Sequence, residues 1–156
     1  MTSITKDLND MKDCIDACNS LLRGELSAIE TYSMAIHTYV GEPEAITLEK
    51  IRSEHIESAN LLRQNVKAMG GEPDHNSGAW GAFAKTVQGT ANMLGERTAI
   101  QVLLQGEEHG RNAYNAALEN EDVMAECKDM ISSILLPRIH HHIAALETLG
   151  VPATRQ

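Results

Sequence analysis

The stretch that decides the fold covers residues 15–39, IDACNSLLRGELSAIETYSMAIHTY. Apolar or small residues recur in it at alternating steps of three and four, which places them on one face of an α-helix. This stripe consists of Ile15, Cys18, Leu22, Glu25, Ile29, Tyr32, Ile36 and Tyr39. Glu25 is the only charged residue in the stripe. The pattern therefore predicts a bundle helix that carries one carboxylate toward the interior.

Three further stretches show the same periodicity. The sequence predicts four long helices, over about residues 5–39, 43–69, 96–119 and 122–149. Pro137 should interrupt the last helix, because proline lacks the backbone N–H that a helix interior needs. The first and last turns are short, so the helices should form two antiparallel hairpins. About 25 residues separate the hairpins, which predicts a long, partly helical crossover in a ferritin-like four-helix bundle.

Composition supports an all-α fold in one domain, residues 1–156. Hydrophobic residues make up 42% of the chain and aromatic residues only 3%, which disfavours an all-β fold. No apolar run approaches the roughly 20 residues of a membrane span, and the N-terminus does not resemble a secretory signal. The net charge of −9 argues against a nucleic-acid partner. Three cysteines, an odd number, fit a reducing cytoplasm better than a disulfide framework.

A short repeat links the two halves of the chain. Gly24-Glu25 is followed by Tyr32 with the same spacing that separates Gly106-Glu107 from Tyr114. Glu107, like Glu25, is the lone charge in an otherwise apolar helix stripe. A buried carboxylate is costly unless a proton, a cation or a metal ion neutralises it. Glu25 and Glu107 are therefore the residues that most need an explanation.

The other two helices offer partners for these carboxylates. The second helix places His55 on its stripe, and the fourth presents the adjacent histidines His140, His141 and His142, of which only one or two can face inward. Two carboxylates and two imidazoles that converge from four helices suit iron, zinc or manganese. The predicted metal ligands are therefore Glu25, His55, Glu107 and His142.

A metal-free core is the alternative. In it, Arg138 pairs with Glu25 or Glu107, and the histidines bond to the backbone or to water. Counting residues back from each turn places His55 within one helical turn of Glu25, but places Arg138 closer than His142 to the level of Glu107. The sequence leaves both alternatives open.

Two residue pairs allow a functional and a structural interpretation. Tyr32 and Tyr114 fit core tyrosines with satisfied hydroxyls, or donors to the two carboxylates. Cys14 and Cys18 share a helix face. They fit small core residues best, although a redox pair or a second metal site has the same spacing.

On these residues the chain resembles the ferritin-like superfamily. The resemblance rests on Glu25-x6-Tyr32, on Glu107-x6-Tyr114 and on the crossover between two hairpins. Residues 70–73 (GGEP) and 78–83 (GAWGAF) look closest to a bacterial family of short ferritin-like proteins of unassigned function. The resemblance implies a di-iron site with a Glu-x-x-His motif in the second and fourth helices.

This sequence departs from that motif. The second helix reads Glu54-His55-Ile56-Glu57, and Ile139 stands where the fourth helix should carry its glutamate. A full di-iron set is therefore missing, and a site for one metal ion or an asymmetric site is expected instead. Two functions follow as hypotheses. The first is a ferritin-like protein that binds a transition metal ion, in stress or metal handling. The second is a non-enzymatic bundle that lost its metal site and acts by self-association or by binding a partner.

Overall fold

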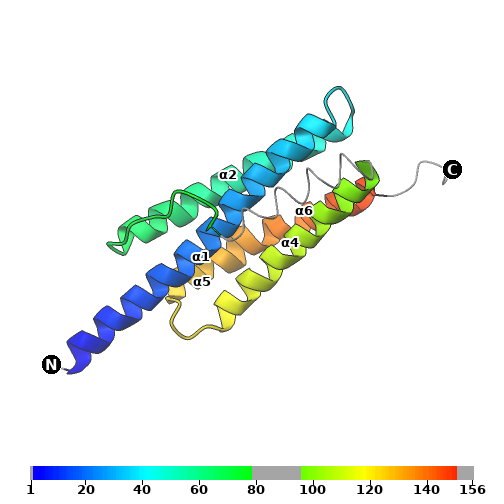
Figure 1. Cartoon of the computed structure of the whole chain (residues 1–156). Coiled ribbons are helices and arrows are strands. Elements are labelled where there is room, and N and C mark those ends of the chain that lie inside the picture. Colours follow the sequence, from blue (N-terminus) through cyan, green and yellow to red (C-terminus); the bar gives the residue numbers. More distant parts are fainter. Residues whose placement is uncertain (1, 79–95, 151–156) are drawn as a thin grey trace.

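The computed structural model describes residues 2–78 and 96–150, and all regular structure within them is helical (Figure 1). The first three helices are α1 (Thr2–Thr38), α2 (Glu44–Ala68) and α4 (Glu96–Glu119). The fourth consists of α5 (Ala125–Met130), the π-helical segment η2 (Ile131–Leu135) and α6 (Leu136–Leu149). The four predicted helices are confirmed, with bounds that differ by a few residues.

The helices pack as two antiparallel hairpins in one bundle (Figure 1). α1 pairs with α2, and α4 pairs with α6, while α1 also packs against α4 and α2 against α6. The all-α four-helix bundle expected from the sequence is thus confirmed. The central part of the predicted crossover, residues 79–95, lies outside the described residues. Within the described parts of the chain, no helix is both long enough and apolar enough to cross a membrane.

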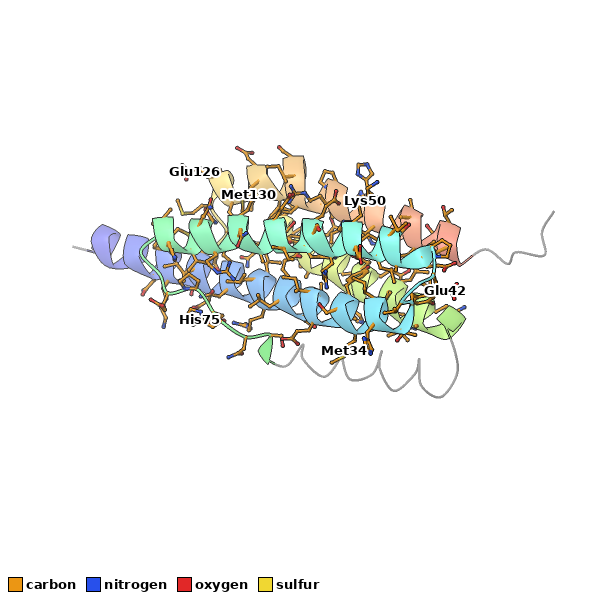
Figure 2. All side chains as sticks on the ribbon, turned by 90° about the horizontal axis from the view of Figure 1, so that it is seen from above. Met34, Glu42, Lys50, His75, Glu126 and Met130 are labelled. Carbon is orange, nitrogen blue, oxygen red and sulfur yellow. The ribbon has the colours of Figure 1, made fainter. Side chains whose placement is uncertain are left out.

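A glycine pair ends α2 and directs the chain back along α1. The Gly70 N–H donates to the Lys67 carbonyl and the Gly71 N–H to the Val66 carbonyl, with Gly70 at φ 84°. This is the hydrogen-bond pattern of a helix end that places glycine in the left-handed region. The next residues are fixed to α1, because Asp74 forms an ion pair with Arg23. Figure 2 shows this segment, which carries His75, beside the hairpin.

The fourth helix changes its geometry just before Pro137. Residues Ile131–Leu135 form a π-helical turn, and Pro137 lies in the first turn of α6. In a regular α-helix the proline ring would clash with the carbonyl of Ser133, four residues earlier. The π turn lies just before the proline, where a regular α-helical turn would produce this clash. The predicted interruption at Pro137 is thus a single π turn.

The apolar core consists of two clusters with a polar layer between them. On α1, one cluster includes Leu22 and the other includes Tyr32; on α4, the clusters include Tyr114 and Leu103 respectively. The same division occurs on α2, between Ala59 and Ile51, and on the fourth helix, between Ile139 and Leu146. The buried ionisable residues between the clusters, one on each of the four helices, are Glu25, His55, Glu107 and His142. The bundle therefore places all four predicted ligands at one level.

Candidate metal centre

The four polar residues between the two clusters are almost completely buried. The exposed fraction is 4% for Glu25, 3% for His55, 3% for Glu107 and 2% for His142. Ionisable groups at such burial need partners, because water cannot solvate their charge. The burial predicted for Glu25 and Glu107 from their helix stripes is confirmed.

Three of these side chains converge on one point. One ligand atom each from His55, Glu107 and His142 lies within 4.8 Å of the other two. Glu107 is central to this group, since its Oε1 lies 2.7 Å from His55 Nε2 and 2.9 Å from His142 Nδ1. Two imidazole nitrogens and one carboxylate are a common ligand set for iron and zinc.

The far nitrogen of each imidazole faces a second carboxylate. His55 Nδ1 lies 2.5 Å from Glu25 Oε2, and His142 Nε2 lies 2.7 Å from Glu54 Oε1. An ionised carboxylate can only accept a hydrogen bond, so it fixes a proton on the nitrogen that faces it. A metal ion at this point would displace the proton from the nitrogen that faces Glu107, and the carboxylate on the far side would keep the other proton in place. Metal-binding histidines in proteins almost always have such a carboxylate or carbonyl behind them.

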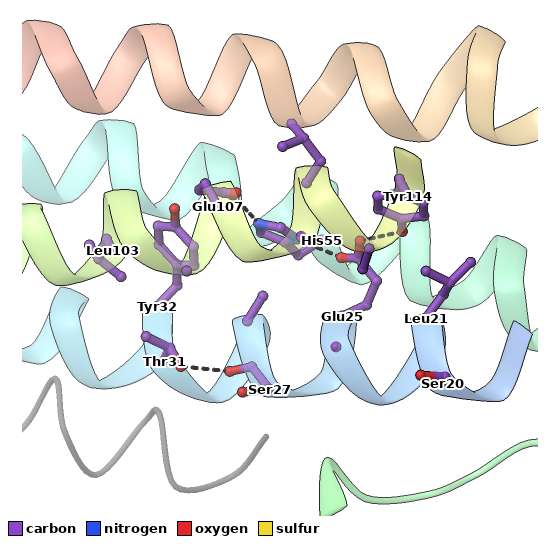
Figure 3. A pocket seen from close by; sticks show the side chains of 16 residues that line it. Ser20, Leu21, Glu25, Ser27, Thr31, Tyr32, His55, Leu103, Glu107 and Tyr114 are labelled. Atoms are coloured by element: carbon purple, nitrogen blue, oxygen red, sulfur yellow. Dashed lines mark hydrogen bonds and ion pairs between the residues drawn. The ribbon is translucent and has the colours of Figure 1, made fainter. Parts of the chain in front are cut away.

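The two tyrosines of the sequence repeat flank this group. Along α1 and α4, Figure 3 shows the labelled side chains in the order Tyr32, Glu107, His55, Glu25 and Tyr114. The Tyr114 hydroxyl donates to Glu25 Oε1 at 2.6 Å, so each tyrosine lies beside the glutamate of the other helix. Tyr114 thus fits the interpretation in which the tyrosines donate hydrogen bonds to the two carboxylates. The antiparallel arrangement of α1 and α4 explains the exchange, because each tyrosine lies C-terminal to its own glutamate.

The equivalent contact on the other side is incomplete. The Tyr32 hydroxyl and Glu107 Oε2 are buried, and neither has a hydrogen-bond partner among the described residues. Burial raises the pKa of Tyr32, and the Glu107 carboxylate raises it further by its charge and as a nearby acceptor, although no hydrogen bond of normal geometry joins the two. Buried polar atoms without a partner are rare in proteins and often mark the place of a water molecule or an ion. These two atoms therefore indicate room for a ligand beside Glu107.

A cavity of about 50 Å³ adjoins the same atoms between α1 and α4. Small residues, among them Gly24, Gly106 and Gly110, leave this space, and Glu25, Tyr32, His55, Glu107 and Tyr114 reach it from the polar side (Figure 3). One buried water molecule needs roughly 10–15 Å³ of such space. The cavity therefore has room for a few water-sized molecules next to Glu107.

The charges of the group stabilise one another. Burial disfavours the charged form of His55, but the carboxylates of Glu107 and Glu25 outweigh it and raise the pKa of His55 well above its usual range. Burial likewise disfavours ionised Glu107, but the charge of His55 and hydrogen bonds from both histidines lower the pKa of Glu107 to about 2. Without a metal ion, a proton on His55 thus holds the place of a cation between two carboxylates.

Arg138 does not supply the counter-charge proposed for the metal-free core. Its guanidinium donates to Ser58 Oγ at 3.0 Å and to Glu57 Oε2 at 3.2 Å, away from Glu25 and Glu107. The count that placed Arg138 closer than His142 to Glu107 was wrong. A π turn fits more residues into each unit of helix length than an α turn, so the residue at the level of Glu107 lies further along the chain.

Residue patterns gave only part of this site. Glu54 stands beside His55 in the sequence, but nothing there shows that it meets His142 from across the bundle. The sequence does show that Glu54 lies next to the helix stripe that carries His55, and this position could have marked Glu54 as a neighbour of the site. The two neighbours of His142, His140 and His141, are exposed and point away from the group.

A comparison with known protein families identifies the family of the chain. A model described as a domain of unknown function, DUF2383, matches residues 13–120. The chain belongs to the DUF2383 family. The DUF2383 match includes Glu25, His55 and Glu107, whereas His142 lies beyond its end. No curated protein and no solved structure matches the chain.

Proposed function

We propose that this DUF2383 protein binds one divalent transition-metal ion in its core, through His55, Glu107 and His142. The observation that carries the proposal is the orientation of the two imidazoles. Each turns one nitrogen toward Glu107 and the other toward a carboxylate behind it, Glu25 for His55 and Glu54 for His142. In this proposal Glu25 orients His55, and Tyr114 holds Glu25 in place. Glu25, which the sequence predicted as a direct ligand, is therefore proposed as a positioning residue.

The spacing of the three ligand atoms supports an ion of this class. Ligands about 2.1 Å from a tetrahedral ion lie roughly 3.4 Å apart, while the nitrogens of His55 and His142 lie 2.7 Å and 2.9 Å from Glu107 Oε1. Side-chain shifts of less than about 1 Å would open the group around an ion. The ligand types suit iron(II), zinc and manganese(II).

The cavity supports an open coordination position. Glu107 Oε2 and the Tyr32 hydroxyl lack partners among the described residues, and Glu107 lines the cavity. A catalytic or transport site keeps such a position for water or a substrate, whereas a structural site is closed by four protein ligands. The proposed ion would therefore be reachable by molecules about the size of water.

The resemblance to ferritin-like proteins supports a role in iron handling or stress protection. A di-iron centre does not fit these residues, because Ile139 occupies the glutamate position of the fourth helix and is 2% exposed within the apolar core. We propose a single ion for that reason. The assignment to iron metabolism rests on the family analogy and the ligand set together.

The charge balance of the metal-free group favours the second candidate function. His55 lies between two carboxylates, and its raised pKa lets it serve as their cation without a metal ion. In a non-enzymatic bundle the polar layer would only fix the packing of the helices, and protonated His55 would balance its charge without a metal ion. The two unpartnered atoms beside the cavity are what such a layer does not explain.

Metal analysis of untagged protein tests the proposal. Protein purified without a His tag is incubated anaerobically with iron(II), zinc or manganese(II), freed of excess metal by gel filtration and analysed by mass spectrometry for bound metal. We expect about one equivalent per chain or less, because the ligand set is too small for a pair of ions. Glu107→Gln should lose this metal, whereas Glu108→Gln, which changes the exposed neighbour, should keep it. Equal metal content in both variants would contradict the proposed site.

A further inference from the structure

Three buried cysteines gather at the end of the bundle where α4 turns into α5. Cys14 and Cys18 come from α1 and Cys127 from α5, and each is at most 1% exposed. The closest pair is not the one suggested by helix spacing. Cys18 Sγ lies 3.2 Å from Cys127 Sγ, although 109 positions separate the two residues in the chain.

The surroundings give the three thiols different roles. The Asn65 side chain donates to Cys18 Sγ at 3.3 Å, and the Met124 backbone N–H donates to Cys14 Sγ at 3.4 Å. The hydrogen bond from Cys18 lowers the pKa of Cys127, while that same bond, followed by burial, raises the pKa of Cys18. Burial raises the pKa of Cys14. Cys18 and Cys127 are therefore the two thiols placed to react with each other, because their sulfurs lie 3.2 Å apart, and the lowered pKa of Cys127 agrees with its role as the attacking thiolate.

We propose that Cys18 and Cys127 form a redox-active dithiol, which hydrogen peroxide oxidises to a disulfide that joins α1 to α5. A disulfide has a sulfur–sulfur bond of about 2.05 Å. The two sulfur atoms must therefore approach by roughly 1.2 Å, which small rotations of the two side chains can supply. Cys14 also contacts Cys18, but it stays a thiol in this proposal because its sulfur accepts the Met124 N–H.

The reaction balances with peroxide as the only oxidant. The Cys127 thiolate attacks one peroxide oxygen and breaks the O–O bond, which gives a sulfenic acid at Cys127 and hydroxide. The sulfur of Cys18 then attacks Cys127 Sγ, forms the S–S bond and displaces the sulfenic oxygen as hydroxide. The Cys18 proton and the proton first released from Cys127 convert the two hydroxides into two molecules of water. The dithiol loses two electrons and the peroxide gains them.

The burial of the three sulfurs bears on which oxidant can reach them. Each cysteine is at most 1% exposed. Leu21 and Tyr114, which line the cavity, belong to the same packed cluster as Cys18 and Cys127. Burial favours a small oxidant such as peroxide over exchange with a bulky disulfide.

Peptide mapping by mass spectrometry tests the proposal on the folded full-length chain. The protein is treated with hydrogen peroxide in the presence of a chelator, then denatured, alkylated and digested. We expect a disulfide between the peptides of Cys18 and Cys127, with Cys14 alkylated. Cys14→Ser is the matched control and should form the same disulfide, whereas Cys18→Ser should not and should leave Cys127 oxidised beyond the thiol.

Two results would overturn the proposal. One is a disulfide between Cys14 and Cys18, and the other is full alkylation of all three cysteines after peroxide treatment. The wild-type map decides between these outcomes even if Cys18→Ser fails to fold. The chelator removes any bound metal ion before peroxide is added, so the outcome is separate from that of the proposed metal site.

Discussion

Tyr32 and Tyr114 occupy equivalent positions in the sequence repeat but differ in their contacts. The Tyr114 hydroxyl donates to Glu25, while the Tyr32 hydroxyl has no partner among the described residues. The cost of losing a hydroxyl depends on what it leaves behind. Removal of a partner strands a buried group, whereas removal of an unpartnered group strands nothing.

Substitution of each tyrosine by phenylalanine measures this difference. We expect Tyr114→Phe to lower the free energy of unfolding of the metal-free protein by about 1.5–3 kcal/mol, because it strands one oxygen of a buried carboxylate. Tyr32→Phe should change that free energy by less than about 0.5 kcal/mol. Urea unfolding of both variants in chelator gives the comparison. Equal losses would mean that the two hydroxyls have equivalent partners.

The pKa shifts of His55 and Glu107 predict how the stability of the metal-free protein varies with pH. The raised pKa of His55 contributes stability that is complete below its ordinary value of 6.5 and is lost as the pH rises through the folded-state value. The lowered pKa of Glu107 contributes stability that is complete above its ordinary value of 4.5 and is lost as the pH falls toward about 2. The second contribution is on the order of 3 kcal/mol.

From these two groups, the metal-free protein should be most stable between about pH 4.5 and 6.5. Urea unfolding in chelator over a pH series checks this prediction, and His55→Gln should flatten the decline on the alkaline side. A metal ion needs neutral imidazoles, so its stabilising effect should grow with pH instead. A wild-type stability in chelator that rises steadily above pH 6.5 would contradict the charge assignment.

At the scale of the elements, the ends of α2 and α6 both carry a glycine, but the backbone needs glycine only at the first. Gly70 has φ 84°, where an L-residue is strained, whereas Gly150 has φ −78°. We expect Gly70→Ala to lower the free energy of unfolding by about 1–2 kcal/mol. Gly150→Ala should change it by less than about 0.5 kcal/mol. Thermal or urea unfolding of both variants checks this, and equal effects would contradict the backbone argument.

The helices could be predicted from the sequence because their stripes and stop residues are local. Periodicity alone assigned Glu25, His55 and Glu107 to the interior, and the structure confirms their burial. The fourth helix shows the limit of this approach. Nothing in the pattern predicts the π turn at Ile131–Leu135, and one turn of a different pitch was enough to exchange Arg138 for His142 at the level of Glu107.

At the scale of the whole molecule, contacts across the bundle could not be predicted, because they depend on how four helices pack. The contacts of Glu54 with His142 and of Cys18 with Cys127 join residues 88 and 109 positions apart. Helix spacing places Cys14 beside Cys18, and the packing adds Cys127 to the same sulfur. Tertiary packing likewise decided which glutamate each tyrosine meets. The sequence thus predicts which residues enter the core, and the packing decides which of them touch.

Metal binding should stabilise the whole fold, because the three proposed ligands lie on three different helices. An ion that binds only the folded state adds about 2.7 kcal/mol at a free concentration 100 times its dissociation constant. We therefore expect a higher melting temperature with saturating metal and its return to the metal-free value with chelator. Glu107→Gln should lose most of the increase, while Glu108→Gln should keep it. A wild-type melting temperature that neither metal nor chelator changes would favour the metal-free polar layer.

Anomalous X-ray diffraction from crystals of the untagged protein loaded with zinc or iron tests the central claim most directly. Data collected on both sides of the absorption edge of the metal locate the ion without assumptions about its ligands. We predict one anomalous peak per chain inside the bundle, between His55 Nε2, His142 Nδ1 and the carboxylate of Glu107, with Glu25 and Glu54 behind the two imidazoles. A peak only at the exposed His140 and His141, or no peak in the core of metal-loaded crystals, would contradict the proposed metal centre.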